Sequence, residues 1–203
     1  MDSTGFWWIL IAVAVYGALH SLLASLTVKG LAERLFGAVG KRGYRLFFNV
    51  VAVISLAPVF ILMISMPDRM IYRIPFPWAL LARAGQLLGT VGLILGVFQT
   101  GAANFIGIEQ VIDPEKGGQR RMTVSGLYRW VRHPLYTCGL LILWLTPVMS
   151  WNIFAFNLAA TLYITIGAWL EERKLRLEFG AAYDEYCRRM PMLIPGFNRK
   201  PRK

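Results

Sequence analysis

The stretch RWVRHPLY, residues 129–136, places two arginines and a histidine close before a proline. Proline suits the first turn of a helix, where its missing N–H group leaves no hydrogen bond unmade. The helix dipole and the other free N–H groups favour an anion there, and Arg132 and His133 would strengthen that preference. A second interpretation stays open for the arginines, because basic residues also gather on the cytoplasmic side of membrane segments. It does not cover His133, since membrane orientation depends on Lys and Arg.

Two adjacent acids, Glu171 and Glu172, directly follow a later apolar run. Neighbouring helix residues point about 100° apart, so we expect at most one of them to face a shared pocket and the other to lie at the surface. The alternative is a solvated helix end, with Glu172 and Arg176 as a favourable pair four residues apart. Further on, Tyr183 and Tyr186 share one helical face, and we expect them to pack against the protein.

His20 lies inside an apolar run, in YGALHSLLAS. An ionisable group within a membrane segment faces the interior of a helix bundle or a cavity. A hydrogen-bonded structural histidine and a substrate-binding residue are both open interpretations. The chain has only two cysteines and two histidines, without the spacing of a zinc site, so we expect no metal.

The composition is that of an integral membrane protein. Of the 203 residues, 56% are hydrophobic and 16% are charged, against about 25% charged in ordinary soluble domains. The net charge of +11 could suggest nucleic acid as a partner, but the basic residues lie between apolar runs, as they do in cytoplasmic membrane loops. We therefore expect contact with membrane lipids and no nucleic-acid binding.

Apolar runs long enough to cross a bilayer cover residues 6–26, 46–66, 84–103 and 134–170. The fourth run is too long for one crossing and contains a corner at residues 150–152, so it predicts two crossings joined by a tight turn. The expected fold is thus all-α: a single integral membrane domain, residues 1–203, with five transmembrane helices. The last two form a helical hairpin, and a cytoplasmic helix follows near the C-terminus.

The basic residues predict how these spans are oriented. Nineteen of the 22 Lys and Arg residues fall on one side of the predicted spans and three on the other. This asymmetry predicts an N-terminus outside the cell and a cytoplasmic C-terminus. The hairpin then brings His133 and the Glu171–Glu172 pair to the same membrane face, although they are far apart in sequence.

Two blocks, SGLYRWVRHPLYTCG and EERKLRLEFGAAYDEYCRRMPMLIP, resemble the catalytic half of the isoprenylcysteine carboxyl methyltransferase superfamily, which includes phospholipid and small-thiol methyltransferases. The resemblance covers residues 123–195. Within the first half, YGALHSLLAS and YRLFFN are similar to the small-thiol and related bacterial branches. The resemblance implies a catalytic half of about residues 104–203 and S-adenosylmethionine as the cofactor, bound at the cytoplasmic face.

The resemblance also implies which residues serve the cofactor. By motif, these are Thr123, Tyr128, His133, Pro134, Leu135, Tyr136 and Glu171. The chain departs from the family at Gly167, where prenylcysteine enzymes place a substrate-binding arginine. This departure puts recognition of a prenylcysteine carboxylate in doubt.

The resulting hypothesis is an S-adenosylmethionine-dependent methyltransferase of the bacterial inner membrane, acting on an acceptor that enters from the bilayer. Prenylcysteine, phospholipid amine, small thiol and isoprenoid acid all remain as acceptors. An amine would have to lose a proton, and Glu172 is the candidate catalytic residue for that step. His20 is the candidate substrate-binding residue. The alternative is a non-enzymatic membrane accessory or transport protein that retains the fold.

Overall fold

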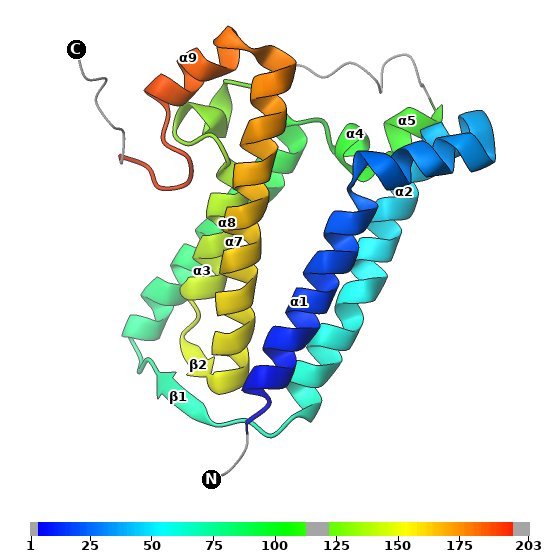
Figure 1. Ribbon diagram of the computed structural model, residues 1–203. Coiled ribbons are helices and arrows are strands. Elements are labelled where there is room, and N and C mark those ends of the chain that lie inside the picture. The colour runs from blue at the N-terminus through cyan, green and yellow to red at the C-terminus, as the bar shows by residue number, and fades with distance from the viewer. Residues whose placement is uncertain (1–3, 113–121, 197–203) are drawn as a thin grey trace. The chain divides into compact units, whose positions relative to one another are not determined.

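The computed structural model describes residues 4–112 and 122–196, which are mainly helical (Figure 1). The elements in chain order are α1 (Phe6–Leu23), α2 (Leu26–Ser65), β1 (Met70–Arg73), α3 (Trp78–Gln99), α4 (Ala102–Ile106), α5 (Ile108–Ile112), the 3-10 helix η1 (Gly126–Arg129), α7 (Pro134–Trp144), β2 (Val148–Ser150), α8 (Trp151–Phe179) and α9 (Ala181–Arg189). The only sheet among these residues pairs β1 with β2. Because the two strands are short and the helices hold most of the described residues, the predicted all-α class is confirmed.

Four of the described helices, α1, α2, α3 and α8, are long and apolar enough to cross a membrane. The expected fourth span is different, because α7 has only 11 residues and is too short to cross as a helix alone. It ends at Trp144, and the chain continues through Pro147 into β2. Proline lacks the N–H group that a helix needs and disfavours helical geometry in the residue before it. The described residues thus support four spanning helices and not the predicted five.

Helix α2 begins much earlier than the predicted span at residues 46–66. Ser25 caps its N-terminus, where the Ser25 Oγ accepts a hydrogen bond from the Val28 N–H at 3.3 Å. The helix breaks at Gly37, whose φ of 57° lies in a region that glycine adopts without steric cost. Much of the basic stretch that the sequence places between two spans is therefore helical.

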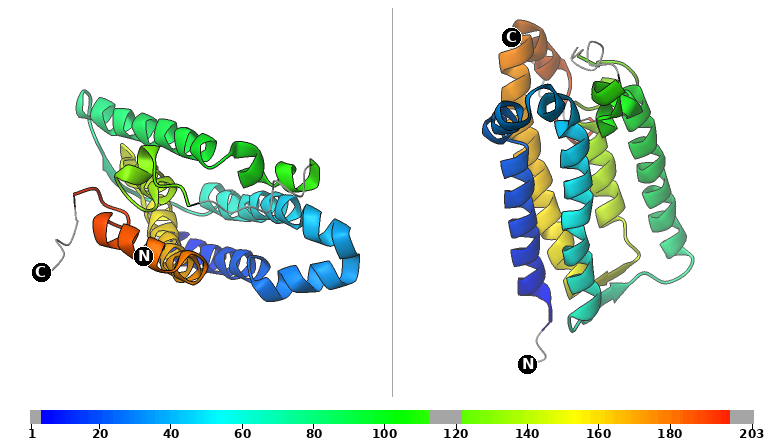
Figure 2. Two further views of the ribbon diagram at one scale, coloured as in Figure 1. Left: turned by 90° about the horizontal axis from the view of Figure 1, so that it is seen from above. Right: turned by 90° about the vertical axis from the view of Figure 1, so that its right-hand side faces the viewer.

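The described residues divide into two compact units, and the first holds residues 4–72, 101–112 and 149–159. In this unit α1 lies beside α2 (Figure 2). Its buried core consists of Ile9, Val13, Val59 and Ala155. The start of α8 is fixed here by the Asn152 N–H, which donates to Asp68 Oδ1 at 3.1 Å.

The second unit holds residues 73–100, 122–148 and 160–196. Helix α3 lies against α7 in it (Figure 2). Glycines of α3 allow the close approach. A Cβ atom on Gly92 would lie 2.7 Å from Cys138 Sγ, and one on Gly96 would lie 2.6 Å from a methyl carbon of Leu135. Gln86 adds a hydrogen bond from its side-chain amide to the Ile142 carbonyl at 2.9 Å. This packing fixes α7, whose first residues form the candidate site.

Candidate active site

The candidate site lies in the second unit, where α7 begins and the apolar part of α8 ends. His133 is the N-cap residue and Pro134 the first residue of α7, as the sequence predicts. The His133 side chain is 5% exposed and does not cap the helix. Its ring stacks on that of Tyr136, with the ring centroids 5.4 Å apart.

Glu172 is the buried acid of the site, and it is 4% exposed. Its Oε1 accepts a hydrogen bond from Arg132 Nε at 2.7 Å, forms an ion pair with Arg132 Nη2 at 2.6 Å, and lies 3.4 Å from His133 Nε2. Its Oε2 lies 3.4 Å from Arg176 Nη2. Burial by itself would raise the pKa of Glu172, but the contacts with His133 and Arg132 lower this pKa below its ordinary value. Glu172 is therefore held as a carboxylate.

Glu171 is the more exposed acid, with a side chain 46% exposed. Its Oε2 accepts a hydrogen bond from the Tyr136 hydroxyl at 2.9 Å and lies 3.7 Å from His133 Nδ1. The two acids thus approach different nitrogens of one imidazole. As the sequence predicts, one acid is buried and the other lies at the surface, and the His133 ring is wide enough to contact both.

Two tyrosines of α9 pack as the sequence predicts. Tyr183 is 2% exposed, and its ring centroid lies 6.0 Å from that of Tyr186. The Tyr186 hydroxyl donates to the Tyr128 carbonyl at 2.6 Å, so α9 is tied to η1. Burial, followed by the charge of Glu171, raises the pKa of Tyr128 to about 12. Tyr128 is thus an un-ionised side chain close to the exposed acid.

The chain after α9 runs along the start of α7, which the sequence did not predict. The Arg132 N–H donates to the Pro191 carbonyl at 2.9 Å, and the His133 N–H donates to the Met192 carbonyl at 3.1 Å. The Thr137 hydroxyl donates to the Leu193 carbonyl at 2.6 Å. All three acceptors are backbone carbonyls, which every residue carries, so no residue type signals these contacts.

The structure also places the remaining predicted site residues. Pro134 is buried, and Leu135 and Thr123 are half-buried in the second unit. His20 belongs to the first unit, where its ring centroid lies 4.6 Å from that of Phe48 and 5.6 Å from that of Tyr16. His20 is therefore set among aromatic side chains, and its expected role in substrate binding stays a prediction.

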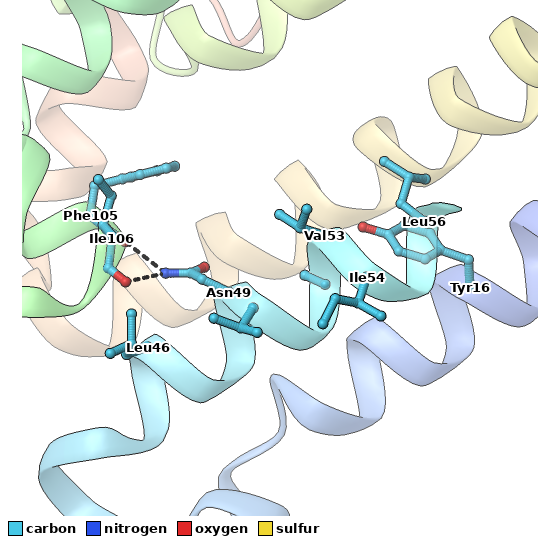
Figure 3. Close-up of a pocket in the computed structure, with 10 residues that line it drawn as sticks. Tyr16, Leu46, Asn49, Val53, Ile54, Leu56, Phe105 and Ile106 are labelled. Atoms are coloured by element: carbon cyan, nitrogen blue, oxygen red, sulfur yellow. Dashed lines mark hydrogen bonds between the residues drawn. The ribbon is translucent and has the colours of Figure 1, made fainter. Parts of the chain in front are cut away.

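The first unit contains an apolar cavity of about 530 Å³ (Figure 3). Asn49 crosses one end of it, donating its side-chain amide to the carbonyls of Phe105 at 3.1 Å and Ile106 at 2.6 Å. The lining is otherwise mainly aliphatic and aromatic, and consists of Tyr16, Leu46, Asn49, Val50, Ala52, Val53, Ile54, Leu56, Phe105 and Ile106. With no charged residue in this lining, the cavity offers contact to hydrocarbon.

Comparison with known proteins matches this chain to one family model and to several relatives that share the same name. A family model described as NnrU protein matches residues 8–152. The methanethiol S-methyltransferase of Crocosphaera subtropica is 27% identical over 195 residues, which cover 93% of this chain and 74% of that protein. The methanethiol S-methyltransferase of a Pseudomonas species is 30% identical over 198 residues, which cover 93% of this chain and 73% of that protein. Methanethiol S-methyltransferase 2 of Bradyrhizobium diazoefficiens is 51% identical over 69 residues, which cover 34% of this chain and 27% of that protein.

No solved structure gives a significant match. The family model nevertheless covers well over half of the chain, and the Pseudomonas relative aligns along most of its own length. Apolar helices of spanning length and methyltransferase relatives together support a membrane methyltransferase. The chain belongs to the NnrU protein family, and with its methanethiol S-methyltransferase relatives to the isoprenylcysteine carboxyl methyltransferase-like superfamily.

Proposed function

We propose that this protein transfers a methyl group from S-adenosylmethionine to a small thiol at the membrane. The observation that carries the proposal is the convergence of Glu171 and Glu172 on His133 at the start of α7. The relatives are named methanethiol S-methyltransferase, which favours a small thiol among the acceptors that the sequence leaves open.

The side chains around His133 fit a methyl donor that carries an ammonium and a carboxylate. Glu171 is exposed on one side and held by Tyr136, so its carboxylate is available to an ammonium through a charge-assisted hydrogen bond. His133 Nε2 is buried and lies 3.4 Å from Glu172 Oε1, which orients the imidazole between the two acids. The start of α7 favours a carboxylate through the helix dipole. The donor supplies an electrophilic methyl group on a sulfonium sulfur.

The state of Glu172 favours an acceptor that is already an anion. Two arginines contact its two oxygens, and its pKa lies below the ordinary value, so it is a weak proton acceptor. A thiol loses its proton to water and reacts as the thiolate, which is intrinsically nucleophilic even as a small fraction of the thiol, so it needs little help from a base in the site. For such an acceptor, alignment with the donor is the main requirement. The expected role of Glu172 as a proton acceptor for an amine stays a prediction, and its contacts favour a positioning role.

Gly167 supports a small acceptor without a carboxylate. It lies in α8, four residues before Glu171, where the resemblance implies an arginine in prenylcysteine enzymes. A Cβ atom built on Gly167 would meet no atom within 4 Å, so packing within the described residues does not require glycine here. The missing arginine removes the group that would recognise a prenylcysteine carboxylate.

The charge asymmetry places this site on the cytoplasmic side of the membrane in our proposal. Helix α7 has 11 residues and rises about 16 Å, and the six residues that follow add up to about 20 Å if extended. Together they are long enough to cross a hydrocarbon layer of about 30 Å. The C-terminus is then cytoplasmic although α7 alone is too short to span, and the donor arrives from the cytoplasm.

The proposal is tested with the full-length protein in detergent and methyl-labelled S-adenosylmethionine. Three acceptors are compared: methanethiol, phosphatidylethanolamine and a farnesylated cysteine. We expect labelled thioether from the thiol and at least tenfold slower labelling of the other two. Preferential labelling of the lipid amine or the prenylcysteine would overturn the thiol assignment. Failure to label any of the three would favour the accessory or transport alternative.

A further inference from the structure

We infer that Arg132 is a positioning residue, which holds the chain after α9 against the start of α7 and thereby sets His133 and Glu171 for the methyl donor. The inference rests on the proposed function. By sequence, Arg132 resembles the other basic residues at the cytoplasmic ends of the spans. Its side chain, however, is only 11% exposed, so it does not serve as a solvated surface charge.

One guanidinium group joins three segments of the second unit. Its Nε and Nη2 contact Glu172 on α8. Its Nη1 donates to the carbonyls of Cys187, in the last turn of α9, and Met190, which directly follows that helix. The last carbonyls of a helix have no partner within the helix, and a buried arginine both satisfies them and complements the helix dipole. Arg132 thus links α8, the end of α9 and the start of α7.

The backbone continues the same connection. The N–H groups of Arg132 and His133 donate to the carbonyls of Pro191 and Met192, so residues 190–192 follow the chain that enters α7. His133 is therefore held through its own backbone as well as by the Arg132–Glu172 pair beside its ring. Loss of the guanidinium would release both the segment and the buried carboxylate.

Lysine keeps the charge but cannot replace this geometry. A guanidinium presents several N–H donors in a rigid fork, whereas an ammonium is one compact group on a flexible stem. A lysine at position 132 can still neutralise Glu172, but it cannot also reach the two carbonyls with the same geometry. Arg132→Lys therefore keeps the positive charge beside Glu172 and removes the contacts that position the chain after α9. Glu172→Gln is the complementary variant, because it keeps the shape and removes the charge.

The test compares Arg132→Lys and Glu172→Gln with Arg129→Ala, an exposed arginine three residues away and the control. Melting temperature, donor affinity by calorimetry and the KM values for donor and thiol are measured on full-length protein. We expect both site variants to fold, to bind S-adenosylmethionine at least tenfold more weakly and to raise the donor KM by a similar factor. The thiol KM should stay within twofold, and Arg129→Ala should stay within a few-fold of the wild type in all readouts.

Hydrogen exchange without donor gives an independent readout. In Arg132→Lys, the amides of Arg132 and His133 should exchange at least tenfold faster, while those of α3 should be unchanged. Wild-type donor affinity in Arg132→Lys, or an equal rise in both KM values, would overturn the positioning role. If the wild type binds no donor, the methyltransferase proposal fails, and unchanged exchange would separately show that Arg132 does not hold the segment.

Discussion

Two carboxylates that are neighbours in the sequence have different environments at the scale of single residues. Glu172 is 4% exposed and paired with Arg132, whereas the Glu171 side chain is 46% exposed and accepts a hydrogen bond from Tyr136. A buried paired carboxylate is already satisfied, while an exposed one can accept an ammonium from a ligand. We therefore assign different tasks to the two acids.

Replacing Glu171 by Gln should weaken the binding of S-adenosylmethionine. The ammonium of the donor loses a charged partner, and a hydrogen bond to a charged group contributes about 1.5–3 kcal/mol, which is roughly tenfold or more in affinity. Calorimetric titration measures the change. Glu185→Gln is the control, because Glu185 is an acid of α9 paired with Arg188 and Arg189. Unchanged affinity in folded Glu171→Gln would contradict the assignment.

His133 and Arg129 are predicted to have different roles, the first in the candidate site and the second in membrane orientation. His133→Ala should abolish or strongly reduce methyl transfer with membrane insertion and melting temperature intact, since it removes the ring between the two acids. Arg129→Ala should keep activity within a few-fold, because Arg129 is exposed and is one basic residue among many on its side of the membrane. Turnover of both variants with a thiol acceptor measures the difference. An inactive Arg129→Ala beside an active His133→Ala would refute this division of roles.

At this scale the sequence predicts the meeting of His133 with Glu171 and Glu172, because motif and hairpin place them at one end. It does not predict the role of Arg132. An arginine at a membrane boundary is already explained by membrane orientation. The groups that Arg132 binds, the backbone carbonyls of Cys187 and Met190, are present in every residue type and cannot be recognised from the sequence.

At the scale of elements, the close contact of α3 with α7 positions the site. Gly92 is where this contact is most sensitive, since a Cβ atom there would lie 2.7 Å from Cys138 Sγ. Gly92→Ala should therefore destabilise the protein by about 1–3 kcal/mol through overpacking. Thermal melting of the purified protein measures the loss.

The matched control for that prediction is Gly139→Ala in α7, where a Cβ atom would meet nothing within 4 Å. This control should be neutral or slightly stabilising, since alanine is the better helix former. Adding Cys138→Ala to Gly92→Ala should recover most of the loss, measured against Cys138→Ala alone. If the double variant recovers nothing, the sulfur contact is not the cause.

The apolar runs predict α1 closely and α3 with bounds that lie several residues too late, but hydropathy does not separate helix from extended chain. It therefore misses the early end of α7 near Pro147 and the strand β2. It also misses the helical start of α2, because that stretch carries basic residues and reads as a loop. The Ser25 cap stabilises the start of this helix.

At the scale of the whole molecule, the distribution of Lys and Arg predicts an N-terminus outside and a C-terminus in the cytoplasm. A reporter fused after Lys203 that is active only in the cytoplasm should therefore be active, and one that is active only outside should be silent. The same pair of reporters fused before Met1 should give the reverse pattern. Activity of the external reporter at the C-terminus would contradict this orientation, and the N-terminal pair would then separate a different number of crossings from an inverted chain.

The central claim, that this membrane protein binds a methyl donor for transfer, is tested most directly by calorimetric titration of S-adenosylmethionine into the detergent-purified full-length protein. The account predicts saturable binding of one donor molecule per chain, weakened at least tenfold by Glu171→Gln and unaffected by Glu185→Gln. A folded wild-type protein that shows no saturable binding would contradict the account and favour a non-enzymatic membrane function.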